Sequence, residues 1–279
     1  MRRRERDLCE SGAPVIWLLG GLDPSGGAGI LRDHWTARAL LPAARVGAIV
    51  SAWTWQGQGA PARSEARPLA RIVAELRALP RPDAVKVGLV PQTLLAAGLG
   101  DALVAAARGA PLVVDPVLVA SDGGDLGAGV GALRGLAAAA TVMTPNLPEA
   151  RALLGIPAGS ATQPSRGALL DGLAAIAGAT AWLLKGGHVE AESGGEQAGE
   201  VADHLRLGGR VVDFRRPRRP GPDPRGTGCA LATAIACGLA SGRPLEAAVA
   251  EAITWLDGAR TAWRPGRDRR PHLPVAGVV

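Results

Sequence analysis

Residues 15–30 have the sequence VIWLLGGLDPSGGAGI, in which an apolar run is followed by a glycine-rich turn and then by the start of a helix. The run has the length of a buried strand. Glycine has no Cβ, so a turn of this kind lets a ligand approach the backbone closely. It is also found as an ordinary tight turn with Asp23 as a helix cap, and its spacing matches neither a P-loop nor the dinucleotide fingerprint. The segment predicts strand, turn and helix, and leaves the purpose of the turn open.

The same alternation continues along the chain. Further apolar runs lie at 46–53, 84–90, 111–119, 140–146 and 181–187, and helix-like patterns at 69–79, 93–107, 147–154, 169–177, 227–240 and 245–261. Residues 201–214 predict a hairpin turning at Gly208 and Gly209, and RRPRRPGPDPRG (215–226) predicts neither strand nor helix. We therefore expect an α/β fold of three layers, α/β/α, with a central, mostly parallel sheet.

The chain has 279 residues, of which 47% are apolar, enough for a sizeable core. No Pro/Ser-rich linker divides it. We expect a flexible N-terminus (1–13), a single domain (14–264) and a Pro/Arg-rich C-terminal tail (265–279).

Composition argues against several classes of protein. The net charge is +6, but the basic residues gather at 1–6, 210–225 and 264–270 rather than along one helix face, so we expect no nucleic-acid partner. Three irregularly spaced cysteines favour neither a disulfide framework nor a zinc site. The chain has neither a secretory signal nor an uncharged apolar run of about 18 residues, so we expect a cytoplasmic protein with no membrane partner.

A second glycine-rich turn, RGTGCALATAIACGLASG (225–242), leads into a helix of small residues. The backbone N–H groups of Gly226, Thr227, Gly228 and Cys229 would converge at the helix N-terminus, where the macrodipole favours an anion such as a phosphoryl group. The same position would lower the pKa of the Cys229 thiol. The alternative is that Cys229 is a small buried residue at a helix start.

Two further motifs carry polar side chains at strand ends. In TPNLPEARALLG (144–155), Asn146 and Glu149 share one helix face and could orient waters around a magnesium ion, or could simply cap the helix. In LLKGGH (183–188), Lys185 ends a strand and is suited to a phosphate contact. Only Lys86 and Lys185 are lysines among 31 basic residues. In a chain that otherwise uses arginine, a lysine at this strand end indicates that the shape of the side chain matters there.

Taken in order, these motifs resemble one family. GGLDPSGGAGILRD, VKVGLV, VVDPVLVASDGGDL, MTPNLPEARALLG, LLKGGH and GTGCALATAIACGL are similar to motifs of the hydroxymethylpyrimidine and phosphomethylpyrimidine kinases, within the ribokinase-like superfamily. The resemblance covers residues 15–260. It implies ATP-dependent phosphorylation of 4-amino-5-hydroxymethyl-2-methylpyrimidine, and of its monophosphate to the diphosphate, in thiamine biosynthesis, with Mg²⁺ and in a homodimer.

The resemblance also implies roles for single residues. Asp23 would lie near the acceptor hydroxyl, Cys229 would be the base, and residues 226–229 would form the anion hole. The residues implied for the pyrimidine pocket are Gly21, Ala28, Thr54, Gln56, Leu89 and Val117. Those implied for ATP are Lys185, Asp115, Asn146 and Thr227, and those for water-mediated magnesium binding are Glu149 and Asn146.

Several positions depart from the family pattern. Arg225 replaces the usual histidine, residues 57–59 are GQG in place of Asn-Thr, and Ser121 replaces a common lysine. Trp53 and Trp55 would add bulk to the pocket wall. Two alternatives stay open: a pyridoxal or pyridoxamine kinase of the same fold, and a catalytically silent pyrimidine-binding sensor.

Overall fold

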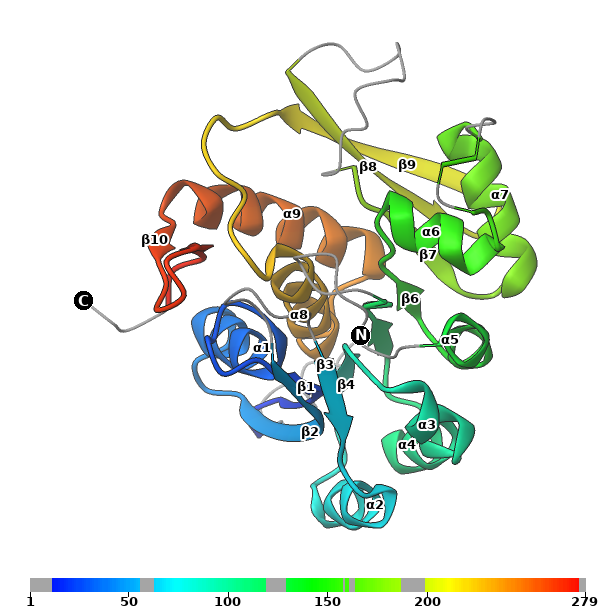
Figure 1. Ribbon diagram of the computed structural model, residues 1–279, viewed down its shortest axis with the longest axis vertical. Helices are drawn as coiled ribbons and strands as arrows, with labels where there is room; N and C mark the ends of the chain where they lie inside the picture. Colours follow the sequence, from blue (N-terminus) through cyan, green and yellow to red (C-terminus); the bar gives the residue numbers. More distant parts are fainter. Residues whose placement is uncertain are drawn as a thin grey trace, which may run out of the picture.

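The computed structural model describes residues 12–55, 63–118, 129–157, 159–160, 164–186 and 199–275 of the chain. In this part of the chain, one large sheet lies between two layers of helices (Figure 1). The predicted three-layer architecture is therefore confirmed.

Nine strands of the described residues form the sheet, in the order β3-β2-β1-β4-β5-β6-β7-β8-β9. They are β1 (Val15–Leu22), β2 (Arg45–Trp55), β3 (Arg63–Ala66), β4 (Ala84–Val87), β5 (Leu112–Val114), β6 (Val142–Met143), β7 (Ala181–Leu184), β8 (Glu200–Leu207) and β9 (Arg210–Pro217). The six strands from β2 to β7 in this order are parallel, and β3, β8 and β9 are antiparallel to their neighbours. The predicted hairpin is β8–β9, with its turn at Gly208 and Gly209.

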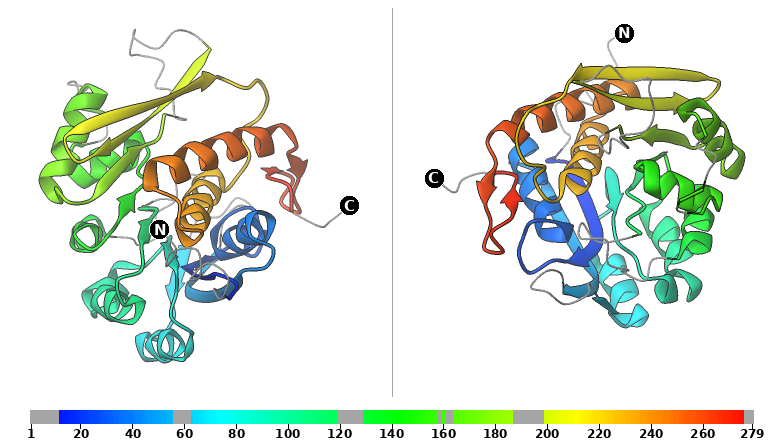
Figure 2. Two further views of the ribbon diagram at one scale, coloured as in Figure 1. Left: turned by 180° about the vertical axis from the view of Figure 1, so that it is seen from behind. Right: turned by 45° about the horizontal axis from the view of Figure 1, so that its top comes forward.

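The helices divide between the two faces of the sheet. One face is covered by α2 (Leu69–Ala78), α3 (Gln92–Ala96), α4 (Leu99–Ala107), α5 (Val130–Ala137), α6 (Leu147–Leu154) and α7 (Arg166–Ile176), and the other by α1 (Gly29–Leu40), α8 (Thr227–Ala240) and α9 (Leu245–Thr261) (Figure 2). Leucine, valine and isoleucine fill most of both cores, with Trp17 and Trp182 fully buried. None of the described helices is long and apolar enough to cross a membrane.

The register of the parallel strands gathers their carboxyl ends at one edge of the sheet. Leu19 of β1 pairs with Val87 of β4, Val87 with Val114 of β5, and Val114 with Met143 of β6. The motifs at 20–30, 144–155 and 183–188 begin at the ends of β1, β6 and β7, whereas the motif at 225–242 follows β9 after a loop. Ligand sites of open α/β sheets lie at this edge, so the topology brings motifs far apart in the chain to one place.

Some predicted boundaries are wrong. The single helix expected over 93–107 is two helices, because Gly98 has a φ of 95° and interrupts the hydrogen-bond ladder between α3 and α4. Strand β9 extends to Pro217, so the first residues of 215–226 are strand after all, paired along β8. The strand β3 was not predicted, because its sequence RSEA has almost no apolar residue. The helix α5 was not predicted either, although its buried residues Leu133, Leu136 and Ala137 recur at helical spacing.

The segment after Arg264 is folded as far as residue 275. It forms a short hairpin of β10 (Arg264–Pro265) and β11 (Pro271–His272), drawn in red beside the blue α1 (Figure 1). A parallel bridge joins His272 to Arg225. This hairpin contacts the loop between β1 and α1 and thus lies close to the glycine-rich motifs.

Candidate active site

The two glycine-rich turns, expected from separate parts of the sequence, are in direct contact. Gly226 is the N-cap of α8 with a φ of 74°, and a Cβ added there would lie 2.2 Å from the carbonyl oxygen of Gly27. Only glycine fits this conformation and this approach. Because the first N–H groups of a helix lack intrahelical acceptors, Thr227, Gly228 and Cys229 present their amides beside the 22–28 loop.

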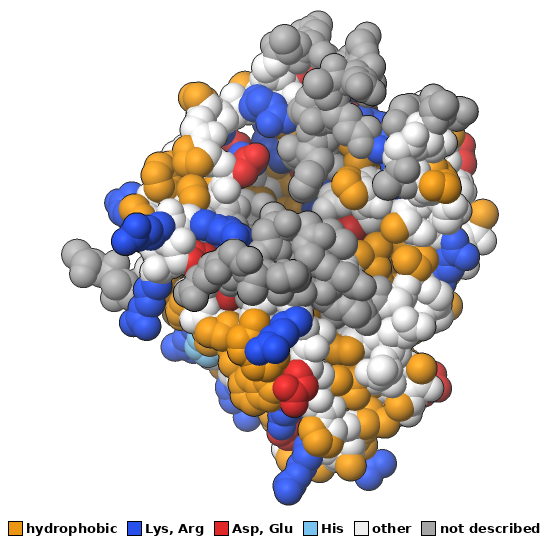
Figure 3. Space-filling view, viewed as in Figure 1, with side chains coloured by type: hydrophobic (Ala, Val, Ile, Leu, Met, Phe, Trp, Pro, Cys, Tyr) orange, Lys and Arg blue, Asp and Glu red, His pale blue; other side chains and the backbone are white. Residues whose placement is uncertain are grey.

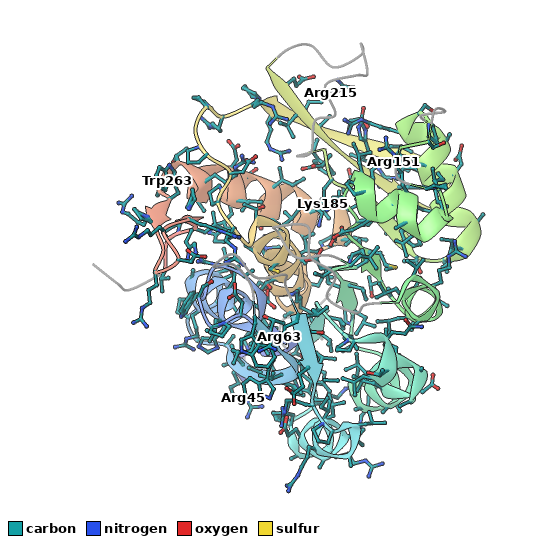
Figure 4. The ribbon with its side chains drawn as sticks, viewed as in Figure 1. Arg45, Arg63, Arg151, Lys185, Arg215 and Trp263 are labelled. Carbon is teal, nitrogen blue, oxygen red and sulfur yellow. The ribbon has the colours of Figure 1, made fainter. Side chains whose placement is uncertain are left out.

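Lys185, just beyond β7, lies near the middle of the molecule, between α6 and α8 (Figure 4). Its Nζ is 2.9 Å from Asp115 Oδ1 and 3.8 Å from Glu149 Oε2. A Cβ added to Gly228 would lie 3.1 Å from this Nζ. The ammonium group therefore lies directly against the start of α8, and three of the predicted ATP-site and metal-site residues meet here.

Burial and the neighbouring charges shift the pKa values of the groups in this cluster. Burial raises the pKa of Glu149 to about 7, with the nearby Asp115 carboxylate adding to the shift and Lys185 opposing it. Burial also opposes ionisation of Asp115, but the ammonium groups of Lys185 and Lys86 hold the pKa of Asp115 below its ordinary value. Thr144 donates a further hydrogen bond to Asp115 at 3.2 Å. The cluster holds two carboxyl groups against one ammonium.

Asn146 and Glu149 form a capping box at the start of α6, the simpler of the two alternatives left open above. Asn146 Oδ1 accepts the N–H of Glu149 at 2.8 Å, and Glu149 Oε2 accepts the N–H of Asn146 at 2.8 Å. The amide oxygen of Asn146 is thus already engaged by the helix. Glu149 keeps its second oxygen for other partners.

Cys229 lies in the first turn of α8, but the expectation of a lowered thiol pKa is wrong. Burial raises the pKa of Cys229 to about 12, and the carboxylates of Asp33 and Asp115 add to the rise. The ammonium of Lys86 and the N–H of Gly29 oppose it. Desolvation and two nearby negative charges outweigh the favourable position at the helix N-terminus.

Sequence reasoning missed a buried network beneath Cys229. Lys86 on β4 donates to Asp33 Oδ2 at 2.6 Å, and Thr233 on α8 donates to Asp33 Oδ1 at 2.9 Å. Thr233 is one helical turn from Cys229, and Asp33 is one turn from the start of α1. The available signal was the lysine count, because both lysines of the chain lie at this site.

Three of the predicted pyrimidine-pocket residues lie together, and the others are placed separately. A Cβ added to Gly21 would lie 2.8 Å from Leu89 Cδ2 and 3.1 Å from Thr54 Cγ2, so these three residues form one wall. Ala28 lies against Gly226, its Cα 3.1 Å from the added Cβ. Val117 is half-buried, and its N–H donates to the carbonyl of Asp115. Gln56 and the neighbouring Gly57 lie outside the described residues.

Trp53 and Trp55 do not add bulk to that wall, contrary to expectation. Alternate residues of a strand point to opposite faces. Thr54 is 2% exposed and faces Gly21, whereas Trp53 is 44% and Trp55 41% exposed. The guanidinium of Arg63 on β3 stacks over the ring of Trp55, 4.6 Å from its centroid.

Comparison with known proteins decides the family. The model of the phosphomethylpyrimidine kinase family matches residues 23–273, nearly the whole chain. The chain belongs to this family. It is 34% identical over 260 residues, 90% of each chain, to a hydroxymethylpyrimidine/phosphomethylpyrimidine kinase of Streptomyces coelicolor, and 34% identical over 253 residues, 88% of this chain and 89% of the relative, to one of Rhizobium meliloti.

A solved structure confirms the fold. The pyridoxal kinase of Staphylococcus aureus in complex with AMP-PCP and pyridoxal matches 95% of this chain and 94% of its own with a TM-score of 0.77, at 22% identity. At that identity the likeness concerns the ribokinase-like architecture alone. The phosphomethylpyrimidine kinase family therefore rests on the sequence matches, and the fold on both.

Arg225, the residue that departs from this family's pattern before the GTGC motif, is 5% exposed and is an integral part of the site. Its Nη2 is 3.1 Å from Asp23 Oδ2. Asp23 in turn accepts hydrogen bonds from the N–H groups of Ser25 and Ala28. Asp23 thus supports its own loop, and Ala28, the N-cap residue of α1, makes no side-chain capping hydrogen bond.

Proposed function

We propose that the protein is an ATP-dependent kinase that phosphorylates the hydroxymethyl group of 4-amino-5-hydroxymethyl-2-methylpyrimidine and then converts the monophosphate to the diphosphate. The observation that carries this proposal is the contact between Lys185 and the N-terminus of α8. It places a fixed ammonium and a row of backbone N–H groups around one point. The names of the relatives support the pyrimidine as acceptor.

Phosphoryl transfer depends mainly on positioning and on neutralising the charge of the transferred group. In this proposal the amides of residues 227–229 bind the transferring phosphoryl group, and Lys185 binds an adjacent phosphate oxygen. The wall of Gly21, Thr54 and Leu89 holds the pyrimidine ring next to the 22–28 loop. Cys229 is the proposed acceptor of the hydroxyl proton.

Magnesium fits the carboxylates of this site. Asp115 and Glu149 both face Lys185, so two carboxyl groups from different elements lie close together there. Oxygen ligands of this kind suit a hydrated Mg²⁺ that arrives with the nucleotide. Glu149 would contact its water shell, whereas Asn146 would act by fixing the start of α6. When bound, the ion would neutralise charge on the phosphates.

Other parts of the proposal come from sequence and family resemblance. They are a single kinase domain over 14–264, a C-terminal segment from 265 onward, a homodimer, and a cytoplasmic location. The predicted flexible N-terminus (1–13) lies, apart from residues 12 and 13, outside the described residues. On the face drawn in Figure 3, Lys and Arg side chains are interspersed with apolar and acidic ones. We propose no nucleic-acid partner, because the basic residues of the sequence gather in separate segments rather than along one helix face.

The test is an assay of the purified protein with Mg-ATP and four acceptors: the hydroxymethylpyrimidine, its monophosphate, pyridoxal and pyridoxamine. We expect turnover of the first two acceptors, and mass spectrometry identifies the products. The matched control is Lys185→Ala, which should lose most of the activity while keeping its fold. Turnover of pyridoxal alone would overturn the assigned acceptor, and binding without turnover of any acceptor would indicate a sensor.

A further inference from the structure

The C-terminal hairpin is joined to both glycine-rich turns. The N–H of Arg225, just before α8, donates to the carbonyl of Pro271 at 2.8 Å. On the other side, a Cβ added to Gly27 would lie 2.6 Å from His272 Nε2. The imidazole therefore packs directly on the backbone of the 22–28 loop, and the hairpin spans the contact between that loop and the start of α8.

A guanidinium with two carboxylates lies at the centre of this junction. Arg225 Nη2 is 3.1 Å from Asp23 Oδ2, and Nη1 is 2.6 Å from Asp268 Oδ2 and 3.1 Å from Ser25 Oγ. Asp268 Oδ1 also lies 2.9 Å from His272 Nε2. The planar fork of arginine can hold two such partners at once. Asp23 and Asp268, from distant parts of the chain, are thereby linked through one side chain.

A second buried arginine makes the same connection from α1. Arg32 is 1% exposed and donates to the carbonyl oxygens of Leu273 at 2.9 Å, Pro274 at 3.0 Å and Gly26 at 3.4 Å. A buried cation is costly unless its donors are satisfied. Two of these three acceptors belong to the C-terminal segment, so that segment is needed to keep Arg32, and the turn at Gly26, in place.

We propose that Asp268 and Arg225 are positioning residues of the acceptor site, through which the C-terminal hairpin holds the 22–28 loop against the anion hole. This inference rests on the proposed kinase function, since that loop would carry the pyrimidine and Asp23. The contact of Gly226 with Gly27 leaves no free space between the two turns. A loosened loop therefore alters the distance from acceptor to phosphoryl group while the α8 amides stay in place.

The test variant is Asp268→Asn, which keeps the shape of the side chain and removes its charge. We expect the KM for the pyrimidine to rise about 10-fold, as for loss of one charged hydrogen bond, with the KM for ATP changed less than about 2-fold. Amide hydrogen exchange of residues 25–28 should accelerate. Asp171→Asn is the matched control, because Asp171 is 71% exposed in a surface pair with Arg206.

Two further variants separate positioning from general stability. Arg225→Lys keeps the positive charge but loses the planar guanidinium that donates to two carboxylates. Its KM for the acceptor should lie between those of the wild type and Asp268→Asn. The double variant Arg225→Lys/Asp268→Asn should be no worse than the poorer single one, since both act through one contact. If the variants raise the KM for ATP as much as the KM for the acceptor and also lower the melting temperature, the hairpin is merely structural. That result would overturn the proposal.

Failure of the kinase proposal is recognisable separately. If the wild-type protein phosphorylates none of the acceptors, the hydrogen exchange of residues 25–28 still reports whether Asp268 holds the loop. Unchanged exchange and unchanged acceptor KM in Asp268→Asn would overturn the positioning role, whatever the substrate is.

Discussion

Lys86 and Asp33 form an ion pair from which solvent is excluded: Nζ lies 2.6 Å from Oδ2, with side-chain exposures of 1% and 0%. Asp33 also accepts a hydrogen bond from Thr233. The three residues belong to β4, α1 and α8, so one buried carboxylate joins a strand to both helices whose first turns border the candidate active site. Removing either charge leaves the other unpaired in the interior.

Lys86→Met should therefore lower the free energy of unfolding by about 3–5 kcal/mol, the cost of breaking a buried pair from one side. Urea denaturation followed by circular dichroism measures it. The double variant Lys86→Met/Asp33→Leu removes both charges and should recover a large part of the loss. A single variant as stable as the wild type would show that the pair contributes nothing.

Cys229→Ala separates the sulfur from the anion hole, because the backbone amides remain. If Cys229 accepts the hydroxyl proton, kcat should fall about 10²- to 10⁴-fold, the usual range for general-base catalysis, with the KM for ATP nearly unchanged. The pKa of the thiol is raised to about 12, so its thiolate fraction increases throughout the neutral and alkaline range. The wild-type kcat should rise with pH, and Cys229→Ala should lose this rise.

Alkylation provides an independent measure of the same thiol. The rate of iodoacetamide modification at Cys229, followed by mass spectrometry, should still increase above pH 9, since the thiolate is the reactive form. A rate that levels off below pH 8 would contradict the raised pKa, and parallel pH profiles in wild type and Cys229→Ala would contradict the base role.

Glu149→Gln should stabilise the protein relative to the wild type as the pH rises. The pKa of Glu149 is raised from its ordinary 4.5 to about 7, so the folded state holds this proton more tightly than the unfolded chain does. The folded state therefore loses stability as the pH rises from about 4.5 to about 7. Glutamine keeps an acceptor for the capping box but has no proton to lose.

The expected gain for Glu149→Gln at pH 8, compared with pH 5, is on the order of 1–3 kcal/mol. Urea denaturation of both proteins at the two pH values measures it. The same difference between variant and wild type at pH 5 and pH 8 would show that Glu149 ionises normally in the folded state.

Neighbouring residues of β2 should respond in opposite ways to substitution. Trp53→Ser should leave the KM for the pyrimidine within about 2-fold of the wild type, because this side chain faces away from Gly21 and ordinary surface changes have small effects. Thr54→Leu should raise that KM at least about 10-fold by filling the space at Gly21 and Leu89. Steady-state kinetics at saturating ATP measures both, and a reversed order would move the pocket to the other face of β2.

The sequence by itself determined the layers of the fold and the order of its motifs. Apolar runs that alternate with helical patterns require a sheet covered on both faces, and this local signal survives without knowledge of contacts. It also identified the segments at 20–30, 144–155, 183–188 and 225–242, which the fold gathers at the carboxyl edge of the sheet. The strand β3 was not foreseen, because its sequence RSEA carries almost no apolar signal, and the eight-residue helix α5 was missed although its buried residues recur at helical spacing.

Tertiary structure alone decided how the polar side chains of the site behave. Lys86 and Asp33 are 53 positions apart, and Arg225 joins Asp23 to Asp268 from near the end of the chain. Desolvation depends on every element packed around a group, and Coulomb interactions depend on distance in space rather than along the chain. For this reason a cysteine at a helix N-terminus has a raised thiol pKa, and a segment expected to be a tail supports the loops of the candidate active site.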